Sequence, residues 1–436
     1  MIEHSTFAGG TPDREALQEA IRHLRLPSTI RQRCANITAM VAAGESAHFT
    51  IDRSKLGEVA RRVARLTRER YPGAVVPLHS RWRHFGAGGI DRAAQLDARM
   101  AGADKAEMAR TRIDLVVISV LLDPGAGPER GYGEGGGGRR HVRSEGLAVA
   151  TFNGFMAGHF SSDLRAPLRV DAKALETMDA QRLGAVFQVR DSNPLVGLEG
   201  RVALMRRLGA ALRERADVFP APGRPGQLFD VLSHAAVRAA AATPAEQRTQ
   251  RLPVARIAAP HILRAVLKAF GGIWPSGQML AGKPVGDVWF HPAAGGTGID
   301  ANRVPFHKLS QWLVYSMVEP LQWAGLTVDR LDELTALPEY RNGGLLIDAG
   351  VIVPRKPDYA SQVYTPADRW VVEWRALTVT LIDDVARLVR TELNEPRLPL
   401  AAVLEGGTWA AGREIAAEVR PGGPPPVRVA SDGTLF

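Results

Sequence analysis

The sequence predicts a mainly α-helical protein, built as one large helical domain with a few short strands. Apolar residues recur every three to four positions through several long segments, which is typical of helices that bury one face. Candidate strands are few and short. The chain has 436 residues, of which 45% are hydrophobic and 23% charged, so the composition indicates a folded protein with a large core.

Helical spacing is clearest in four segments, which are residues 13–25, 54–69, 198–214 and 371–390. Asp52 or Ser54 would cap the second of these helices, because short polar side chains accept hydrogen bonds from the first backbone N–H groups. The apolar run 113–122 contains β-branched residues. Its length fits both a strand and a buried helix, so the sequence leaves both open.

Strands are expected at residues 345–353 and 427–430. Glycine and proline predict loops at residues 124–138, 219–226 and 293–298. We find no internal repeat of the kind that builds solenoids.

The domain organisation follows from these breaks. At roughly 100–200 residues per domain, the length allows two or three domains or one large one. The breaks are typical of loops within one body, so we expect one compact helical unit over residues 1–436. A sub-boundary is expected near 220–250, and residues 421–436 are expected to form a tail after the Gly- and Pro-rich residues 422–426.

The charge raises the question of a nucleic-acid partner. There are 55 Lys and Arg against 46 Asp and Glu, which gives a formal net charge of +9. Only seven of the basic residues are lysine, and the arginines are scattered among acidic residues. Such a pattern is typical of background composition, so we expect no nucleic-acid partner.

Other compositional features bound the class of protein. Cys34 is the single cysteine, so an internal disulfide and a thiolate metal cluster are excluded. The 11 histidines are irregularly spaced, so we expect no metal and no cofactor. The N-terminus lacks the features of a signal peptide, and no apolar stretch reaches the roughly 18 residues of a membrane span. A cytoplasmic protein without a membrane partner is therefore expected, and its oligomeric state is left open.

Clusters of polar and aromatic residues mark the candidate site. The segment 79–85 holds two imidazoles, two guanidiniums and two aromatic rings, which suit an anion and a flat group. Asp123 ends the apolar run 113–122, where its carboxylate would bind ribose hydroxyls or act as a base. Ser144 and Glu145 suit the start of a helix equally well.

Later clusters bring acids and bases close in sequence. Asp287 and His291 would lie within one turn of each other if their segment were helical. Pro305 suits the first turn of a helix that would carry His307, Gln311 and Ser316 towards one face.

The segment 341–344 resembles an anion-binding turn. Glu373 and Arg375 are too near in sequence to face each other on a helix, so each is expected to pair elsewhere. Common nucleotide-loop, zinc-protease and serine-hydrolase motifs are absent from the sequence.

Several segments together resemble one known family. They are HSRWRHF (79–85), RIDLVVISVLLDPGAG (112–127), RSEGLAVATF (143–152), NPLVGLEGR (193–201), GIWPSG (272–277), GDVWFHP (286–292), VPFHKLSQWLVYS (304–316) and LPEYRNGGLLIDAGV (337–351). The family is the URC-pathway uracil-catabolism family. Residues 128–138 depart from its pattern.

The resemblance implies a step in the degradation of uracil through its nucleotide. A partner enzyme related to GTP cyclohydrolases would open the pyrimidine ring. This family would then hydrolyse the N-ribosidic bond of the resulting ribosylurea, which is expected to carry a 5′-phosphate, and release urea. The expected partner is thus a small molecule derived from a nucleoside or nucleotide.

The resemblance also implies roles for the clustered residues. Asp287 is the first candidate for the carboxylate that stabilises an oxocarbenium-like sugar and positions water, and Asp123 is the second. His291 or Glu339 would protonate or orient the urea group. Candidate substrate-binding residues are Arg81, Trp82, His84, Ser144, Glu145, Trp289, Arg303, His307, Lys308, Arg341, Glu373 and Arg375. Among these, Arg81, Arg303, Arg341 and Lys308 would hold the phosphate, and Trp82 and Trp289 would wall the site.

A fainter resemblance concerns the queuosine-nucleotide salvage glycosidases. It is carried by Asp287-x-Trp289, by Arg303-x-Pro305 followed by Tyr315-Ser316, and by Glu373-x-Arg375. Those proteins are helical and akin to helix–hairpin–helix DNA glycosylases, so a fold of that kind is expected. Their aspartate before Arg-x-Pro has no direct counterpart, and Asp300 is the nearest carboxylate.

Two alternative functions remain at this stage. A non-catalytic nucleic-acid-binding protein would show strongly salt-dependent binding and a contiguous arginine face. A base-excision glycosylase would need a pocket for an extrahelical base and a positively charged track for the duplex.

Overall fold

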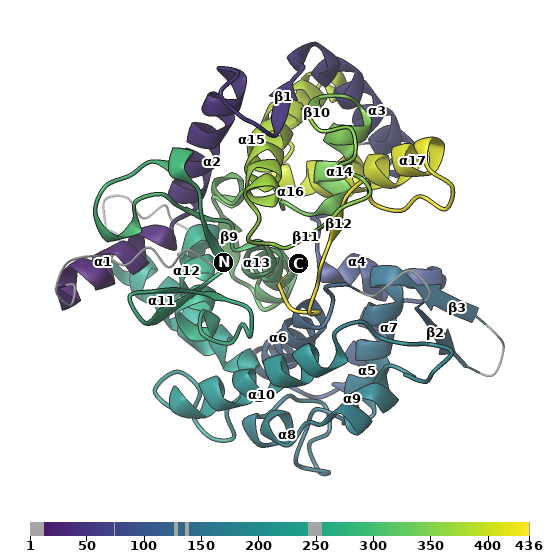
Figure 1. Cartoon of the computed structure of the whole chain (residues 1–436). Helices are drawn as coiled ribbons and strands as arrows, with labels where there is room; N and C mark the ends of the chain where they lie inside the picture. The colour runs from purple at the N-terminus through teal and green to yellow at the C-terminus, as the bar shows by residue number, and fades with distance from the viewer. Residues whose placement is uncertain (1–12, 74, 126–129, 136–138, 243–254, 436) are drawn as a thin grey trace.

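The computed structural model describes residues 13–73, 75–125, 130–135, 139–242 and 255–435, and within these residues it is mainly α-helical (Figure 1). The predicted fold class is confirmed. The α-helices are α1 (Arg14–Leu24), α2 (Pro27–Ala42), α3 (Leu56–Arg70), α4 (Arg81–Phe85), α5 (Arg92–Arg99), α6 (Lys105–Leu121), α7 (Arg143–Met156), α8 (Ala172–Glu176), α9 (Ala180–Val186), α10 (Leu198–Glu214), α11 (Leu228–Ala242), α12 (Ala259–Phe270), α13 (Lys308–Trp323), α14 (Tyr340–Asp348), α15 (Arg369–Leu393), α16 (Leu400–Val403) and α17 (Trp409–Val419).

The strands are short and pair two by two, antiparallel except in the third and last pairs. The pairs are β1 (Phe49–Ile51) with β10 (Ile352–Pro354), β2 (Gly131–Glu134) with β3 (Arg139–Val142), β4 (Arg256–Ala258) with β9 (Thr327–Asp329), β5 (Gln278–Leu280) with β6 (Lys283–Gly286), β7 (Val288–Phe290) with β8 (Arg303–Pro305), and β11 (Val363–Tyr364) with β12 (Arg428–Val429).

Helix α13 lies near the centre of the molecule (Figure 1). On one side of it are α3, α14, α15 and α17, and on the other are α4 to α10. α15 packs against α2 and α3, α14 against α17, and α13 against α6. Every residue of α13 from 309 to 318 is buried, as expected for a helix that is surrounded by protein. Its polar residues therefore do not form a separate exposed face, and Gln311 and Ser316 are hydrogen-bonded inside the core.

The four helices with clear periodicity are confirmed as α1, α3, α10 and α15. Asp52 accepts a hydrogen bond from the backbone N–H of Ser54 at 3.0 Å and caps the 3₁₀ turn Arg53–Lys55 that leads into α3. The run 113–122 is helical and forms the end of α6. Because this part of α6 is buried on all sides, its sequence shows no polar face from which a helix could be recognised.

The predicted strand at 345–353 is wrong over most of its length. Residues up to Asp348 belong to α14, and the strand β10 begins only at Ile352. Glu339 caps this helix, since its two carboxylate oxygens accept hydrogen bonds from the backbone N–H groups of Arg341 and Asn342, both at 2.7 Å. The apolar residues that suggested a strand therefore continue a helix that has already begun.

Two further expectations near the candidate site are corrected. Asp287 and His291 flank the strand β7, so they do not lie on one helical turn. Pro305 ends the strand β8, and α13 begins only at Lys308, after His307 in the left-handed conformation (φ 48°).

The predicted loop at 124–138 is partly wrong as well. Residues 131–134 and 139–142 pair as the hairpin β2–β3, with Glu134 opposite Arg139. Residues 126–129 and 136–138 lie outside the described residues. The loop at 219–226 contains the start of a 3₁₀ turn, Pro225–Gln227, and the expected sub-boundary near 220–250 falls partly on residues 243–254, outside the described chain.

The C-terminal segment packs against the body of the protein. β12 pairs with β11, and Thr434 and Leu435 are buried. A Cβ at Gly200 would lie 2.2 Å from the carbonyl oxygen of Asp432, so glycine is needed for this close approach at the start of α10. The buried guanidinium of Arg201 donates to the carbonyl oxygens of Leu122 at 2.8 Å and Gly433 at 3.1 Å.

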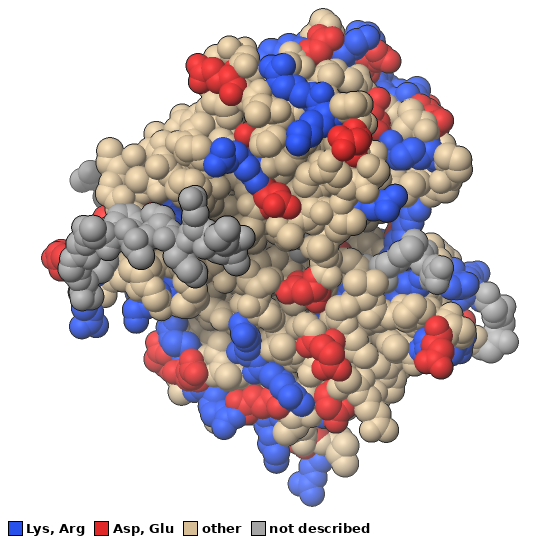
Figure 2. Space-filling model, in the orientation of Figure 1, with Lys and Arg blue, Asp and Glu red and all other residues tan. Residues whose placement is uncertain are grey.

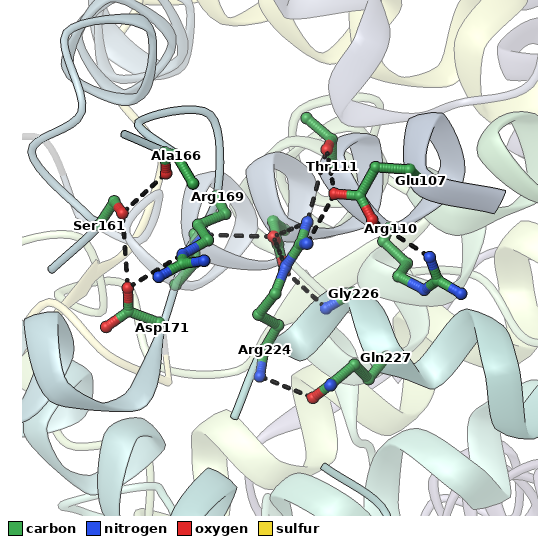
Figure 3. A network of polar contacts seen from close by, with 12 residues as sticks. Glu107, Arg110, Thr111, Ser161, Ala166, Arg169, Asp171, Arg224, Gly226 and Gln227 are labelled. Atoms are coloured by element: carbon green, nitrogen blue, oxygen red, sulfur yellow. Dashed lines mark hydrogen bonds and ion pairs between the residues drawn. The ribbon is translucent and has the colours of Figure 1, made fainter. Parts of the chain in front are cut away.

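A buried polar network fixes α6 to the loops around it (Figure 3). Asp114 is fully buried, and its carboxylate accepts hydrogen bonds from the backbone N–H groups of Gly226 at 2.7 Å and Val170 at 3.1 Å and from Arg224 Nε at 2.9 Å. Arg224 also donates through Nη1 to Glu107 at 2.6 Å. Its Nη2 donates to Thr111 Oγ1 at 3.4 Å, so every polar atom of the Asp114 carboxylate and the Arg224 guanidinium is hydrogen-bonded.

The face shown in Figure 2 carries Lys and Arg side chains mixed with Asp and Glu side chains, with uncharged residues between them. Many arginines are in ion pairs, such as Arg62 with Glu418 and Arg420 with Asp348. In the described part of the chain, no helix is long and apolar enough to cross a membrane.

Candidate active site

The N-terminal ends of several helices meet beside α13. Arg81 is the first residue of α4, Arg143 of α7, Lys308 of α13 and Tyr340 of α14. The start of α4 is bound to α13, because the backbone N–H of Arg81 donates to Ser316 Oγ at 2.9 Å. This arrangement brings the positive ends of helices together, which favours negatively charged groups in the space between them.

Asp123 lies just beyond the end of α6 and faces this meeting point. Its Oδ1 accepts hydrogen bonds from Arg81 Nη1 and from Ser144 Oγ, both at 2.5 Å. Its Oδ2 accepts none from the residues that the structure describes. Burial alone would raise the pKa of Asp123, but Arg81, His84, Ser144 and Lys308 together hold it below its usual value. Asp123 is therefore a carboxylate with one oxygen held in place and one available.

The Lys308 ammonium interacts electrostatically with both Asp123 and Glu339. Burial lowers the pKa of the Lys308 ammonium, while the carboxylates of Glu339 and Asp123 oppose that shift. Burial raises the pKa of Glu339 despite the two backbone N–H groups that its side chain caps. The site thus contains one carboxylate with a lowered pKa and one with a raised pKa, an arrangement typical of sites that accept and donate protons.

Several buried polar atoms around this point have no hydrogen-bond partner among the described residues. They are Arg81 Nη2, His84 Nδ1, Glu145 Oε2, Trp312 Nε1, Arg341 Nε and Asn342 Oδ1. Leaving a buried polar atom unpaired costs about 1–3 kcal/mol. Other such atoms occur elsewhere in the described chain, but these six belong to residues around Asp123 and Glu339, where a polar ligand would satisfy them.

Aromatic rings form a wall of the same site. The Arg81 guanidinium lies over the Trp312 ring at 5.4 Å, and His84 lies edge-on to Trp312 at 5.8 Å and to Trp409 at 5.7 Å. Burial between these rings lowers the pKa of His84 to about 4, so its imidazole is neutral near pH 7. A neutral imidazole can hydrogen-bond a substrate without adding charge.

Trp409 is the first residue of α17 and directly follows the π-helical segment Leu404–Thr408. Glu405 in this segment binds His79 Nδ1 at 2.9 Å and accepts from the Tyr71 hydroxyl at 3.0 Å. π-Helical turns are rare and often lie at functional sites. The segment holds His79 stacked against Trp312. Neither Trp409 nor Arg413 was identified from sequence, because no local motif marks them.

Asp287 lies deeper, behind Lys308. Arg375 donates to its two oxygens at 2.8 Å each, Trp289 Nε1 donates at 2.7 Å, and the backbone N–H of Lys308 donates at 3.0 Å. Burial would raise the pKa of Asp287, but Arg375 and these other donors lower it to about 2. The carboxylate thus ties β7, the start of α13 and α15 together. The prediction that Arg375 pairs away from Glu373 is confirmed.

The remaining predicted residues lie elsewhere. His291 Nε2 is 3.1 Å from Glu373 Oε1, and Ser46 Oγ donates to the other oxygen of Glu373 at 2.5 Å. His307 Nε2 is 3.0 Å from the carbonyl oxygen of Leu24, and Arg303 lies over Phe290.

Trp82 points away from Arg81 on the short helix α4. Its Nε1 donates to the carbonyl oxygen of Ser316 at 3.0 Å, and its ring lines a separate cavity of about 330 Å³ with Trp323. It therefore does not wall the site around Asp123.

Eight predicted residues are thus brought together, and they are Arg81, His84, Asp123, Ser144, Glu145, Lys308, Glu339 and Arg341. Asp287, Trp289 and Arg375 join them through Lys308. No group of three His, Cys, Asp or Glu side chains suited to a metal ion occurs within the described ranges.

Comparison with known proteins agrees with the resemblance seen in the sequence. The family model described as "Protein of unknown function (DUF1688)" matches residues 23–436. The chain belongs to this family. It is 37% identical over 421 residues to "Uracil catabolism protein 4" of Lachancea kluyveri, covering 90% of this chain and 93% of that protein. It is 36% identical over 433 residues to "Protein urg3" of Schizosaccharomyces pombe, covering 96% of this chain and 99% of that protein. The predicted membership in the uracil-catabolism family is therefore confirmed.

Proposed function

We propose that this protein acts in uracil catabolism as a hydrolase that cleaves the N-ribosidic bond of a 5′-phosphorylated ribosylurea and releases urea. The name of the Lachancea relative supports the pathway. The buried cluster around Asp123 supports the substrate class, because it combines a carboxylate, cations and unpaired hydrogen-bonding atoms at the ends of several helices. This cluster is the observation that carries the proposal.

The reaction breaks the bond between C1′ of the ribose and the ureido nitrogen. The bonding electron pair leaves with that nitrogen, which takes up a proton and departs as urea. A water molecule adds to C1′ and loses a proton, so the products are urea and ribose 5-phosphate. The sugar passes through a cationic, oxocarbenium-like state that a nearby carboxylate stabilises.

Asp123 is the carboxylate that we place beside the sugar. Its Oδ2 accepts no hydrogen bond from the described residues, whereas its Oδ1 is fixed by Arg81 and Ser144. Asp287 was the first candidate from sequence, but its oxygens already accept four hydrogen bonds. Since a carboxylate offers about four lone-pair positions, Asp287 is better suited to position Lys308 and Arg375 than to hold water.

Glu339 is the residue that we place beside the ureido group. Its raised pKa favours the protonated form more than at an exposed glutamate, so it can donate the proton that urea needs. His84, which is neutral, would orient the ureido group through a hydrogen bond.

Release of urea from synthetic ribosylurea 5′-phosphate by the purified protein tests this function. We expect turnover by the wild type and a loss of about 100-fold or more in kcat for Asp123→Asn, because a positioned acid or base contributes about 10²–10⁴-fold. Asp97→Asn serves as the control, since Asp97 pairs with Arg112 at a partly exposed position. Absence of urea release by the wild type would contradict the proposed reaction. Full activity of Asp123→Asn would contradict the role of Asp123.

A further inference from the structure

Three arginines from three helices lie together at the edge of the candidate site. Arg143 is the first residue of α7, Arg341 is the second residue of α14, and Arg413 lies in α17. Only Arg341 was identified from sequence. The positions of the other two follow from packing between helices that are far apart in the chain.

Gly412 holds α17 against the first turn of α14. A Cβ at Gly412 would lie 2.4 Å from the carbonyl oxygen of Arg341, so a larger residue would push the two helices apart. The adjacent Arg413 donates through Nη1 to Glu145 Oε1, in the first turn of α7, at 2.7 Å. Burial lowers the pKa of Arg143, and the charges of Arg341 and Arg413 lower it further, as expected for neighbouring guanidiniums.

Aromatic rings fix the planes of two of these guanidiniums. Arg341 lies over the Tyr340 ring and Arg413 over the Trp409 ring, each at 4.9 Å. Stacking of this kind leaves the N–H edges of the guanidinium available to an oxyanion. Arg341 is only 3% exposed, and its Nε donates to no atom of the described chain. A buried donor without a partner indicates a ligand that accepts a hydrogen bond.

The charge of this group also indicates an anion. Glu145 pairs with Arg413, and Glu339 lies near Arg341, so the three guanidiniums exceed these two carboxylates by one positive charge, to which Lys308 beside Glu339 adds a second. A phosphate monoester carries a charge of about −1.5 to −2 at pH 7, and guanidiniums bind its oxygens in pairs. Arg143 adopts the left-handed conformation (φ 56°), which is unfavourable for a side chain of its size and is often found at ligand sites.

We propose that Arg143, Arg341 and Arg413 form a phosphate subsite, through which the enzyme selects a phosphorylated riboside over the unphosphorylated one. The identity of the riboside rests on the proposed function, whereas binding of the phosphate group does not. Glu145 keeps Arg413 in place, and the oxygens of the phosphate accept hydrogen bonds from the guanidinium edges.

Calorimetric titration of the full chain with ribose 5-phosphate, and with ribose for comparison, tests the subsite directly. We expect Arg143→Gln and Arg413→Gln each to weaken binding of ribose 5-phosphate by about tenfold or more, because each removes charge-assisted hydrogen bonds. Arg413→Lys keeps the charge but loses the planar guanidinium, so its affinity for ribose 5-phosphate should lie between those of the wild type and Arg413→Gln. Arg65→Gln is the matched control, since Arg65 also binds α17, through Glu414, away from the cluster.

The ratio of kcat/KM for the phosphorylated and unphosphorylated ribosylurea provides a second readout. We expect Arg413→Gln to lower this ratio by about tenfold or more, with folding verified by circular dichroism. If Arg413→Gln does not fold, Arg413→Lys takes its place. The subsite is refuted if the wild type does not bind ribose 5-phosphate, or if the folded variants bind it as tightly as the wild type. If neither riboside is hydrolysed but the variants bind ribose 5-phosphate more weakly than the wild type, the result supports the subsite and contradicts the proposed reaction.

Discussion

Asp114 and Asp123 are aspartates only nine positions apart, within and just beyond α6; Asp114 is buried and Asp123 is partly buried, and each is paired with a buried arginine. Asp114 accepts hydrogen bonds from two loops and from Arg224, and Arg224 also donates to the neighbouring Glu107. Arg81 and Asp123 are less completely hydrogen-bonded, because Arg81 Nη2 finds no partner in the described structure and the hydrogen bonds from Arg81 and Ser144 both end on Asp123 Oδ1. The same chemical pair thus stabilises the fold in one place and leaves room for a ligand in the other.

Removing Asp114 should have the largest effect on stability. Asp114→Ala leaves Arg224 buried without its main partner and two backbone N–H groups without an acceptor. We expect the free energy of unfolding to fall by about 3–5 kcal/mol, which is the cost of breaking a buried ion pair on one side. Chemical denaturation with a constant m-value measures this change. A loss below about 1 kcal/mol would show that the saturated network does not stabilise the fold.

Asp287 should make the free energy of unfolding depend on pH. Like Asp114, it accepts hydrogen bonds on both oxygens, but it lies beside the candidate site. Its pKa in the folded protein is about 2, below the usual value of 3.8, so it stabilises the fold above pH 4 and this contribution is lost as the pH falls towards 2. The shift corresponds to about 2 kcal/mol. We expect the wild type to lose that much more stability than Asp287→Asn between pH 5 and pH 2, measured by denaturation at each pH. Parallel curves for the two proteins would refute this contribution.

The smallest effect is expected at a partly exposed aspartate–arginine pair of α6. Arg112 pairs with Asp97 at 2.6 Å, but the Asp97 side chain is 44% exposed. Asp97→Asn should change the free energy of unfolding by less than about 1 kcal/mol, because water screens the pair. A thermal denaturation series of the three aspartate variants measures the order Asp114, Asp287, Asp97 directly. A different order would mean that burial does not govern the contribution of these carboxylates.

The sequence could predict the helical class and the helices with one polar face, such as α3 and α15, because periodicity reports burial on one side. The sequence left 113–122 undecided and misassigned 345–353, because segments that are buried on all sides show no periodic alternation of apolar and polar residues. The cap made by Glu339 was the signal that could have corrected the second assignment.

The candidate site was predictable where it is built from local clusters. Arg81 stood out in a cluster of cationic and aromatic residues, and Asp123 and Ser144 as polar residues beside apolar segments. Lys308 was named through the family resemblance, and the structure brings the four together. Arg143 and Arg413 were missed, because their meeting depends on Gly412 and on packing between helices separated by more than 200 residues. Nearness in sequence was misleading for Asp287 and His291, which a strand holds apart.

The packing of Gly433 on Arg201 also bears on how the chain is synthesised. These residues are 232 positions apart, and the buried guanidinium of Arg201 keeps the carbonyl oxygen of Gly433 as one of its acceptors. At roughly 5–20 residues per second, a ribosome needs roughly 12–46 s to make the intervening chain. Throughout that interval Arg201 lacks this acceptor, so the region around α10 can complete its folding only after residue 433 has been made.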